Sequence, residues 1–171
     1  MKIQKQETER HVLTITVDNE SGILAKIAGL FTARGYNIDS LTVADISENH
    51  SVSRITIVTN GPPAQIDQIR AQLERLVPVH KVVDLTEIGP YVERELALIK
   101  VAGTGDKRVE ALRVADIFRA KVVDTSTSSF VFELTGPPDK IDSFVALMRE
   151  LGLVEVGRTG IVGMIRGAQE A

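Results

Sequence analysis

The hydrophobic pattern of the first 35 residues changes period once, from a strand period to a helical one. Residues 11–18 (HVLTITVD) alternate well enough, and are rich enough in β-branched side chains, to predict a strand. Apolar residues then recur at helical spacing, at Ile23, Leu24, Ile27, Leu30 and Phe31. The change falls at residues 19–22 (NESG), and Gly35 is well placed to end the helix in the left-handed conformation. This segment therefore predicts a strand, a tight turn and a helix.

A hairpin is predicted next. Residues 38–47 (IDSLTVADIS) and 53–60 (SRITIVTN) read as strands, and a turn is expected between them. In the second strand Ile55 and Ile57 face opposite to Arg54, because successive side chains of a strand alternate between its two faces. The isoleucines are expected to face the core.

A second helix and a fourth strand complete the pattern. Residues 61–77 (GPPAQIDQIRAQLERLV) begin with two prolines, which a first helical turn tolerates. One face of this helix carries Ile66, Ile69, Leu73 and Leu76. Residues 79–88 (VHKVVDLTEI) read as a strand. The order βαββαβ predicts a four-stranded antiparallel sheet with two helices on one face.

The same order returns after Gly89 and Pro90. The expected elements are strand 94–103, helix 106–119, strands 120–126 and 129–135, a helix, and strand 153–159. Two short segments match closely, since TGPPDKID (135–142) repeats the Gly, two Pro, Ile and Asp of NGPPAQID (60–67) at identical spacing. The helix that follows carries an apolar stripe of Ile141, Phe144, Val145, Met148 and Leu151. The alternative is that the two Gly-Pro-Pro turns match by chance and do not indicate a repeat. We predict two similar domains, 1–88 and 89–171.

Composition and charge exclude several classes of protein. A chain of 171 residues with 43% hydrophobic and 25% charged residues is typical of a soluble globular protein. A net charge of -3 disfavours wholesale binding to a nucleic-acid backbone, and no cysteine is present for disulfides or thiolate chemistry. No stretch approaches the length of a membrane helix, and residues 1–10 lack the apolar centre of a signal peptide. We expect a cytoplasmic protein whose first ten residues are frayed.

Catalytic and metal-binding patterns are not found in the sequence. His11, His50 and His80 have no second histidine or carboxylate at the spacing of a helical metal site, and structural or solvated roles are expected for them. No G-x-S-x-G nucleophile motif occurs. The sequence therefore predicts no catalytic residues and no metal site.

Two glycine-containing segments leave alternatives open. In residues 101–108 (VAGTGDKR) the third glycine of a phosphate-binding loop is replaced by Arg108, so the segment is either an anion loop or a tight turn from strand to helix. Residues 158–167 (RTGIVGMIRG) are expected to form a final extension that packs on the domain or on a partner.

The turn before the first helix is the strongest candidate site. A helix start leaves its first N–H groups unpaired and carries partial positive charge, so it can bind a carboxylate. Gly22 lets a ligand approach the backbone, and Asn19 and Asn37 can each donate and accept hydrogen bonds. The alternative is that Asn19 or Ser21 merely caps the helix and Asn37 merely tolerates a turn.

These residues resemble a known family over nearly the whole chain. Residues 18–44 (DNESGILAKIAGLFTARGYNIDSLTVA), followed by SRITIV (53–58), closely resemble the first ACT domain of the small, regulatory subunit of acetohydroxyacid synthase, also called acetolactate synthase. VERELALIKV (92–101), IFRAKVVD (117–124) and GIVGMIRG (160–167) resemble the C-terminal half of that family. The resemblance implies an α+β fold of two ferredoxin-like βαββαβ units, an ACT domain and a C-terminal ACT-like domain.

The resemblance also implies a function. Members of the family have no active site of their own, bind and activate a separate catalytic subunit, and confer feedback inhibition by valine in branched-chain amino acid biosynthesis. The catalytic subunit carries thiamine diphosphate, magnesium and FAD, and none of these is expected to bind this chain. ACT domains of the family form a homodimer, with valine between the first turn of one chain and the facing chain. The implied effector residues are Asn19, Glu20, Ser21, Gly22 and Ile23, with Asn37 and Ile38 from the facing subunit.

Two rival functions remain open on the sequence. A free-standing ACT-domain amino-acid sensor in transcriptional regulation has the same pocket, although no helix-turn-helix is found. A small enzyme on the split βαβ fold is the second rival, since a fold does not fix a function.

Overall fold

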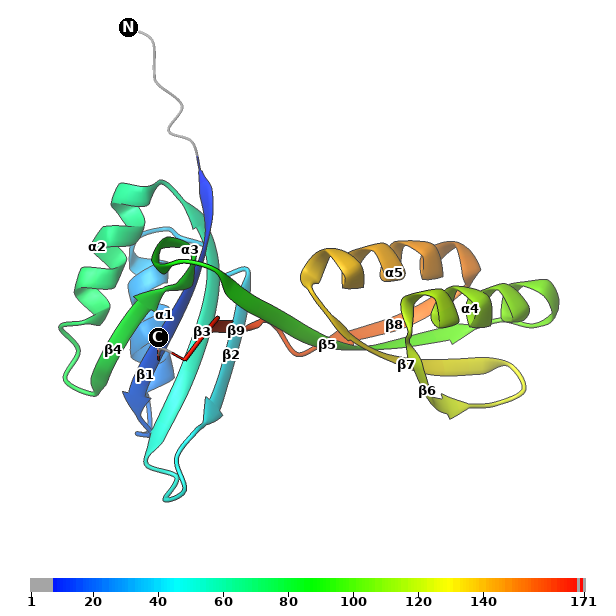
Figure 1. Cartoon of the computed structure of the whole chain (residues 1–171), viewed down its shortest axis with the longest axis horizontal. Coiled ribbons are helices and arrows are strands. Elements are labelled where there is room, and N and C mark those ends of the chain that lie inside the picture. Colours follow the sequence, from blue (N-terminus) through cyan, green and yellow to red (C-terminus); the bar gives the residue numbers. More distant parts are fainter. Residues whose placement is uncertain (1–7, 169, 171) are drawn as a thin grey trace, which may run out of the picture. The chain divides into compact units, whose positions relative to one another are not determined.

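A computed structural model describes residues 8–168 and 170, which form two compact units. Of the described residues, the first unit contains 8–92 together with 161–168 and 170, and the second contains 93–160. The first contains β1 (Glu9–Asp18), α1 (Ile23–Ala33), β2 (Ser40–Asp45), β3 (Val52–Gly61), α2 (Pro63–Leu73), β4 (Val79–Asp84) and α3 (Leu85–Ile88) (Figure 1). Its strands are antiparallel in the order β2-β3-β1-β4. The predicted βαββαβ order is confirmed.

The two faces of the first sheet are different. One face packs against α1 and α2 and contributes Leu13, Ile15, Ile55 and Ile57, all fully buried, to the main core (Figure 1). Ile23, Ile27 and Phe31 of α1 and Ile66, Ile69 and Leu73 of α2 close this core. The predicted inward faces of both helices and of β3 are therefore confirmed.

The C-terminal segment covers part of the other face. Ile161 is buried with Val12, Val58 and Leu85, just before β9 (Val162–Ile165). The Ile161 N–H donates to Ser40 Oγ at 2.8 Å, and the Ile161 carbonyl oxygen accepts from Thr42 Oγ1 at 3.0 Å. The final extension therefore packs on the first unit, whereas a simple division at residue 88 assigns it to the second.

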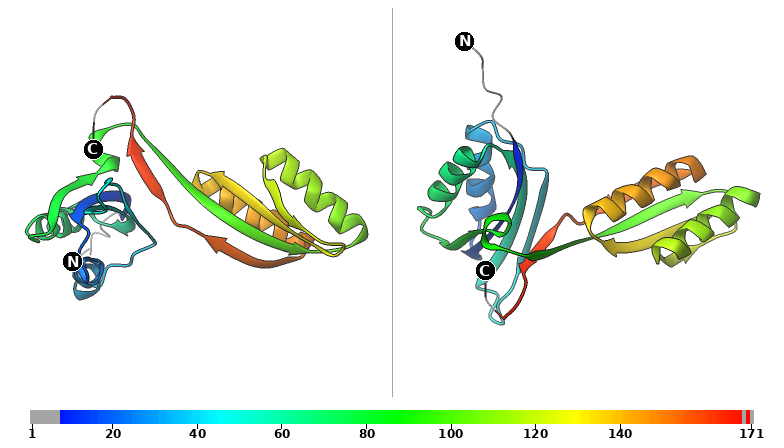
Figure 2. Two further views of the ribbon diagram at one scale, coloured as in Figure 1. Left: turned by 90° about the horizontal axis from the view of Figure 1, so that it is seen from below. Right: turned by 45° about the horizontal axis from the view of Figure 1, so that its top comes forward.

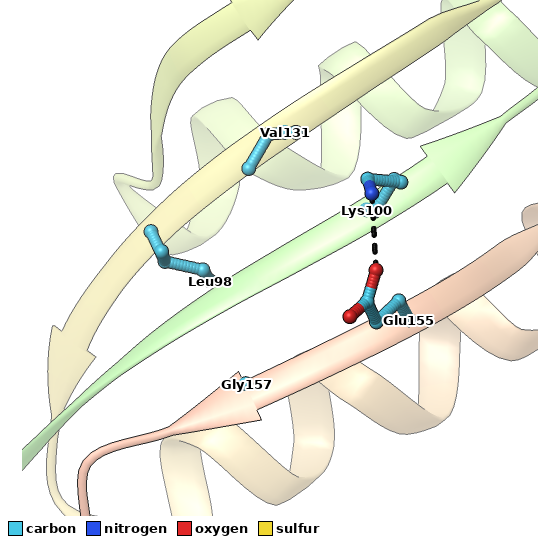
Figure 3. A pocket seen from close by; sticks show the side chains of 5 residues that line it. All are labelled: Leu98, Lys100, Val131, Glu155 and Gly157. Carbon is cyan, nitrogen blue, oxygen red and sulfur yellow. Dashed lines mark hydrogen bonds and ion pairs between the residues drawn. The ribbon is translucent and has the colours of Figure 1, made fainter.

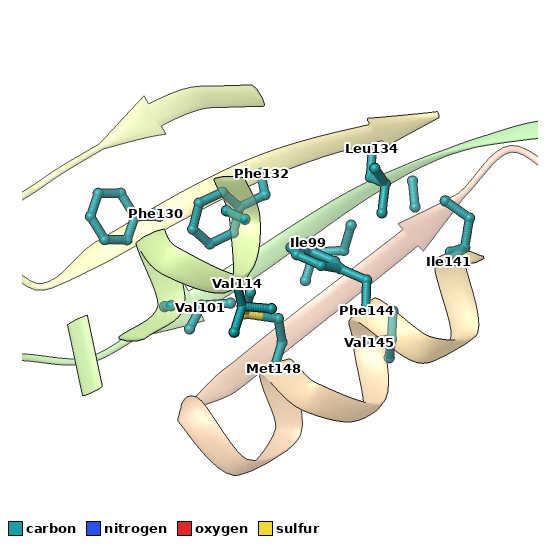
Figure 4. Close-up of a cluster of buried hydrophobic side chains, with 13 residues drawn as sticks. Ile99, Val101, Val114, Phe130, Phe132, Leu134, Ile141, Phe144, Val145 and Met148 are labelled. Carbon is teal, nitrogen blue, oxygen red and sulfur yellow. The ribbon is translucent and has the colours of Figure 1, made fainter. Parts of the chain in front are cut away.

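The second unit repeats the pattern. It contains most of β5 (Tyr91–Ala102), which begins in the first unit (Figure 2), and then α4 (Gly105–Phe118), β6 (Lys121–Thr125), β7 (Ser129–Gly136), α5 (Pro138–Leu151) and β8 (Leu153–Arg158). The strand order is β6-β7-β5-β8. In its core Phe132 meets Phe144 edge to face, with ring centroids 5.9 Å apart (Figure 4). The α+β, ferredoxin-like fold is thus present twice.

Two predicted boundaries are corrected. β4 ends at Asp84, and residues 85–88 form the short helix α3 instead of continuing the strand, because the Asp84 carboxylate accepts from the Thr86 N–H at 2.9 Å and caps a helix there. Glu9 and Arg10 already belong to β1, so the expected fraying of residues 1–10 is wrong for these two. Residues 1–7 lie outside the described residues.

The longest helices, α4 and α5, each have 14 residues. Among residues 8–168, no helix has the length and apolar content needed to cross a membrane.

Candidate functional site

The turn between β1 and α1 leaves the start of the helix uncapped. Gly22 is the N-cap residue with φ of 85°, a left-handed conformation that glycine adopts without strain. No side chain caps the helix, and the N–H groups of Ser21, Gly22 and Leu24 donate no hydrogen bond to any described residue. A Cβ atom added at Gly22 would meet nothing within 4 Å. The turn therefore presents free main-chain donors to open space, which suits an incoming carboxylate.

Asn19 is not the helix cap. Its side-chain Nδ2 donates to the His50 carbonyl oxygen at 2.9 Å, and its backbone N–H donates to the Ser51 carbonyl oxygen at 2.8 Å. These bonds tie the turn to the β2–β3 hairpin and leave Asn19 Oδ1 without a donor among the described residues. Asn19, Glu20 and Ser21 are exposed. The capping alternative for Asn19 and Ser21 is therefore wrong for this conformation.

Ile23 contributes to the turn through its backbone. Its side chain is buried in the core of the first unit, and its N–H points to the Glu20 carbonyl oxygen at 3.4 Å. The Ile23 side chain therefore packs in the core, and only its backbone is part of the turn.

Asn37 and Ile38 lie beyond the other end of α1. Gly35 has φ of 70° and ends the helix as predicted. Asn37 is exposed, its Nδ2 donates to Asp39 Oδ1 at 2.6 Å, and its carbonyl oxygen accepts from Thr59 Oγ1 at 2.7 Å. Ile38 is half-buried against the main core. The exposed Asn37 therefore marks a second polar position at the entrance to β2.

The two groups of predicted site residues are separated within one chain. Helix α1 has 11 residues and lies between them in sequence. At about 1.5 Å per residue the helix is roughly 16 Å long, much longer than a free amino acid. One chain therefore does not bring Gly22 and Asn37 onto a single small ligand.

The hairpin that supports Asn19 is held by Asp45. Its carboxylate accepts from the Ser47 N–H at 2.9 Å and contacts His50 Nδ1. The bond from the Ser47 backbone, followed by that from the His50 side chain, lowers the pKa of Asp45 below its usual value. His50 itself has φ of 57°. The sequence predicted that His50 lies in a turn. It did not predict that the His50 carbonyl oxygen accepts a hydrogen bond from Asn19.

The other two histidines also pair with carboxylates. His80 Nε2 lies 2.6 Å from Asp18 Oδ1 at the surface, and His11 Nδ1 lies 2.6 Å from Asp84 Oδ2 inside the protein. His11, Asp84 and Glu87 together bring three potential ligand atoms close. Two ligands of one zinc ion normally lie about 3.3 Å apart, however, so the short separation of His11 and Asp84 is that of a hydrogen bond.

The glycine-containing loop before α4 is a tight turn in this structure. Gly105 has φ of 58°, and a Cβ atom on Gly103 would lie 3.4 Å from the Leu151 carbonyl oxygen. Arg108 occupies the position that the third glycine has in a phosphate-binding loop. Its guanidinium lies 3.9 Å from the centre of the Phe130 ring. Arg108 thus packs within the second unit, which favours the turn over the anion loop.

The second sheet has a shallow hollow on the face away from its helices. The pocket has a volume of about 260 Å³ and is lined by Leu98, Lys100, Val131, Glu155 and Gly157 (Figure 3). Lys100 Nζ and Glu155 Oε2 are 3.0 Å apart and neutralise each other. This surface combines apolar side chains with a paired charge and carries none of the predicted site residues.

Two ferredoxin-like units, the first with an open glycine turn at its first helix, define a protein of the ACT type. The family models agree with this class: that for the small-subunit ACT domain of acetohydroxyacid synthase matches residues 13–81, and that for the small subunit of acetolactate synthase matches residues 94–167. The chain belongs to the acetolactate synthase small-subunit family.

Individual relatives cover almost the full length. A probable acetolactate synthase small subunit of Archaeoglobus fulgidus is 45% identical over 92% of this chain and 98% of its own length. The isozyme 3 small subunit of Salmonella typhimurium is 42% identical over 92% of this chain and 96% of its own. The crystal structure of the small subunit from Thermotoga maritima has a TM-score of 0.85 and 38% identity, covering 94% of this chain and 99% of that one.

Proposed function

We propose that this chain is the regulatory subunit of acetolactate synthase, that it activates a separate catalytic subunit, and that valine bound to its first unit inhibits the assembled enzyme. Membership of the small-subunit family supports the catalytic subunit as partner. The observation that carries the sensing role is the uncapped start of α1 at Gly22. Thiamine diphosphate, magnesium and FAD belong, on this proposal, to the catalytic subunit alone.

Valine is held by its charged groups at the first turn. Its carboxylate accepts from the free N–H groups at Gly22 and Leu24, where the helix dipole adds partial positive charge. Its ammonium group donates to Asn19 Oδ1 or to a nearby carbonyl oxygen. The isopropyl group lies against an apolar side chain, for which Ile38 of a second chain is the candidate.

A second chain is needed to complete the site. Because Gly22 and Asn37 lie at opposite ends of α1, a twofold axis that sets two α1 helices antiparallel places Gly22 of one chain beside Asn37 of the other. β2 is an edge strand, and its pairing with β2 of a second chain gives this arrangement. Val43 of β2, which is 49% exposed, is apolar surface that such a dimer buries.

Inhibition follows from a difference in affinity between two states. A ligand shifts an equilibrium only as far as it prefers one state, so valine must bind more tightly to a dimer geometry that supports the catalytic subunit less well. On this proposal the first unit binds valine and the second unit contributes to docking or to transmission.

Reconstitution tests the proposal. The purified chain is mixed with the acetolactate synthase catalytic subunit, and turnover of pyruvate is measured with and without valine. The proposal predicts activation by the chain and inhibition of the activated enzyme by valine. No effect of the chain on turnover would contradict it and favour a free-standing amino-acid sensor.

A further inference from the structure

The face of the first sheet away from α1 and α2 contains a cationic pocket that shares no lining residue with the turn at residues 19–23. We propose that this pocket binds a phosphate-bearing ligand. It has a volume of about 600 Å³. The residues that line it are Thr16, Ile46, Arg54, His80, Lys81, Met164, Ile165 and Glu170. All belong to the first unit.

Strand register builds the floor of this phosphate pocket. Ala44 pairs with Arg54, Arg54 with Thr16, and Thr16 with Lys81. Directly paired residues share a face, so one row crosses all four strands on the side away from α1 and α2. Ala44 and Thr16 are small, and they leave space on both sides of the Arg54 side chain. Arg54 and Lys81 therefore lie on opposite sides of Thr16 in this row, one cation on each side.

The charges of Arg54 and Lys81 are not matched by acidic partners. Arg54 Nε is buried and has no hydrogen-bond partner among the described residues. Neither Arg54 nor Lys81 forms an ion pair within residues 8–168, whereas Arg70 and Arg158 each bind two carboxylates. A buried guanidinium N–H without an acceptor is costly, and an incoming anion removes that cost.

Other residues around this row limit which ligands the pocket can bind. His80 is held by Asp18 at 2.6 Å and lies beside Lys81. Met164 and Ile165 of β9, with Ile46, add an apolar wall. Glu170 is the one carboxylate that lines the pocket among the described residues, and it competes with a bound anion.

Phosphate is the anion that fits these donors best. A guanidinium presents N–H groups in a planar fork that matches two phosphate oxygens, and an ammonium group with a hydroxyl can satisfy the third. The apolar wall favours a phosphate ester with a compact organic group, although inorganic polyphosphate shares the same charged part. The pocket and the proposed valine turn have no residue in common, although His80 bonds Asp18, which directly precedes Asn19. Because phosphate binding and valine binding are measured with different ligands, each proposal can fail without the other.

Titration calorimetry with the intact protein tests this site. Inorganic pyrophosphate and phenyl phosphate are titrated separately at constant ionic strength into the wild-type protein. Binding of phenyl phosphate alone identifies an ester as the ligand, and binding of pyrophosphate alone identifies a polyphosphate. Arg54→Gln and Lys81→Gln should each weaken binding about tenfold or more, as expected for a lost hydrogen bond to a charged group.

Two further variants separate specific binding from general charge. Glu170→Gln removes the competing carboxylate and should tighten binding, whereas Arg75→Gln removes an exposed arginine outside the pocket and should leave binding unchanged. Thermal unfolding of each variant verifies that it is folded. Absence of binding by both probes at millimolar concentration, or equal binding by wild-type, Arg54→Gln and Lys81→Gln proteins, would overturn the proposal.

Discussion

The side-chain amide of Asn19 donates to the carbonyl oxygen of His50 at 2.9 Å, and this bond joins the turn before α1 to the β2–β3 hairpin. This bond uses the amide nitrogen of Asn19, and neither Asn19 Oδ1 nor any other side-chain oxygen of the described residues accepts a hydrogen bond from the first turn of α1. The first N–H groups of α1 are therefore uncapped in this structure. They are the donors to which the proposed valine site assigns the ligand carboxylate.

A carboxylate placed at Gly22 should abolish the valine response. Gly22→Asp puts a negative charge where the valine carboxylate is proposed to bind, while Gly22→Asn has nearly the same size without charge. Aspartate and asparagine both tolerate the left-handed conformation better than other non-glycine residues. We expect valine inhibition of the reconstituted enzyme to be lost with Gly22→Asp and largely kept with Gly22→Asn. Equal inhibition of both variants would place the valine carboxylate elsewhere.

Asn37→Ala should weaken feedback by valine while activation of the catalytic subunit is kept. The variant removes a polar group proposed to reach valine across the dimer, at an expected cost of about tenfold in valine affinity. Asn60→Ala is a matched control, because Asn60 Nδ2 donates to the same Asp39 carboxylate, at 2.5 Å, and is not proposed to contact valine. Dose-response curves for valine provide the measurement. Loss of activation by Asn37→Ala would instead assign Asn37 to assembly.

The β2–β3 hairpin should loosen in acid. The pKa of Asp45 is lowered in the folded protein, chiefly by the Ser47 N–H and then by His50, so its contribution to stability is present above the unfolded pKa and is lost as pH falls through the folded pKa. Carboxyl NMR should give a midpoint for Asp45 below the unperturbed value of 3.8. Exchange of the Ser47 amide should accelerate below that midpoint. A midpoint at or above the unperturbed value would contradict the assigned hydrogen bonds.

The C-terminal segment should stabilise the first unit. Ile161→Ala removes a side chain that is 7% exposed and packs on Val12 and Leu85, so the free energy of unfolding should fall by about 2–4 kcal/mol. Val162→Ala is the control, since Val162 is 52% exposed and its truncation should cost well under 1 kcal/mol. Urea unfolding followed by circular dichroism measures both. Similar stabilities of the two variants would show that Ile161 contributes little.

Local pattern was enough to predict most of the fold. The alternation at Ile55 and Ile57, the helical stripes and the repeated Gly-Pro-Pro turns each depend on neighbours in sequence, and the structure confirms them. The uncapped turn at Gly22 was also accessible, because glycine at a change of period signals a special backbone conformation.

The missed features depend on residues far apart in the chain. His11 meets Asp84 across 73 positions, and the backbone of Ile161 meets Ser40 across 121. Neither pairing leaves a local signal, since it exists only after strands and segments have assembled. The row of Arg54, Thr16 and Lys81 likewise arises from strand register, and the sequence gives only the outward direction of Arg54.

Mixing two variants with impaired valine binding tests the central claim, a valine site shared between two chains, most directly. In a twofold dimer of Gly22→Asp with Asn37→Ala chains, one site carries both substitutions and the other carries neither. After subunit exchange, calorimetry should therefore recover high-affinity valine sites amounting to about one quarter of the wild-type number, whereas Gly22→Asp alone shows no binding and Asn37→Ala alone shows only sites about tenfold weaker. A mixture without these high-affinity sites would contradict a site built from Gly22 of one chain and Asn37 of its partner.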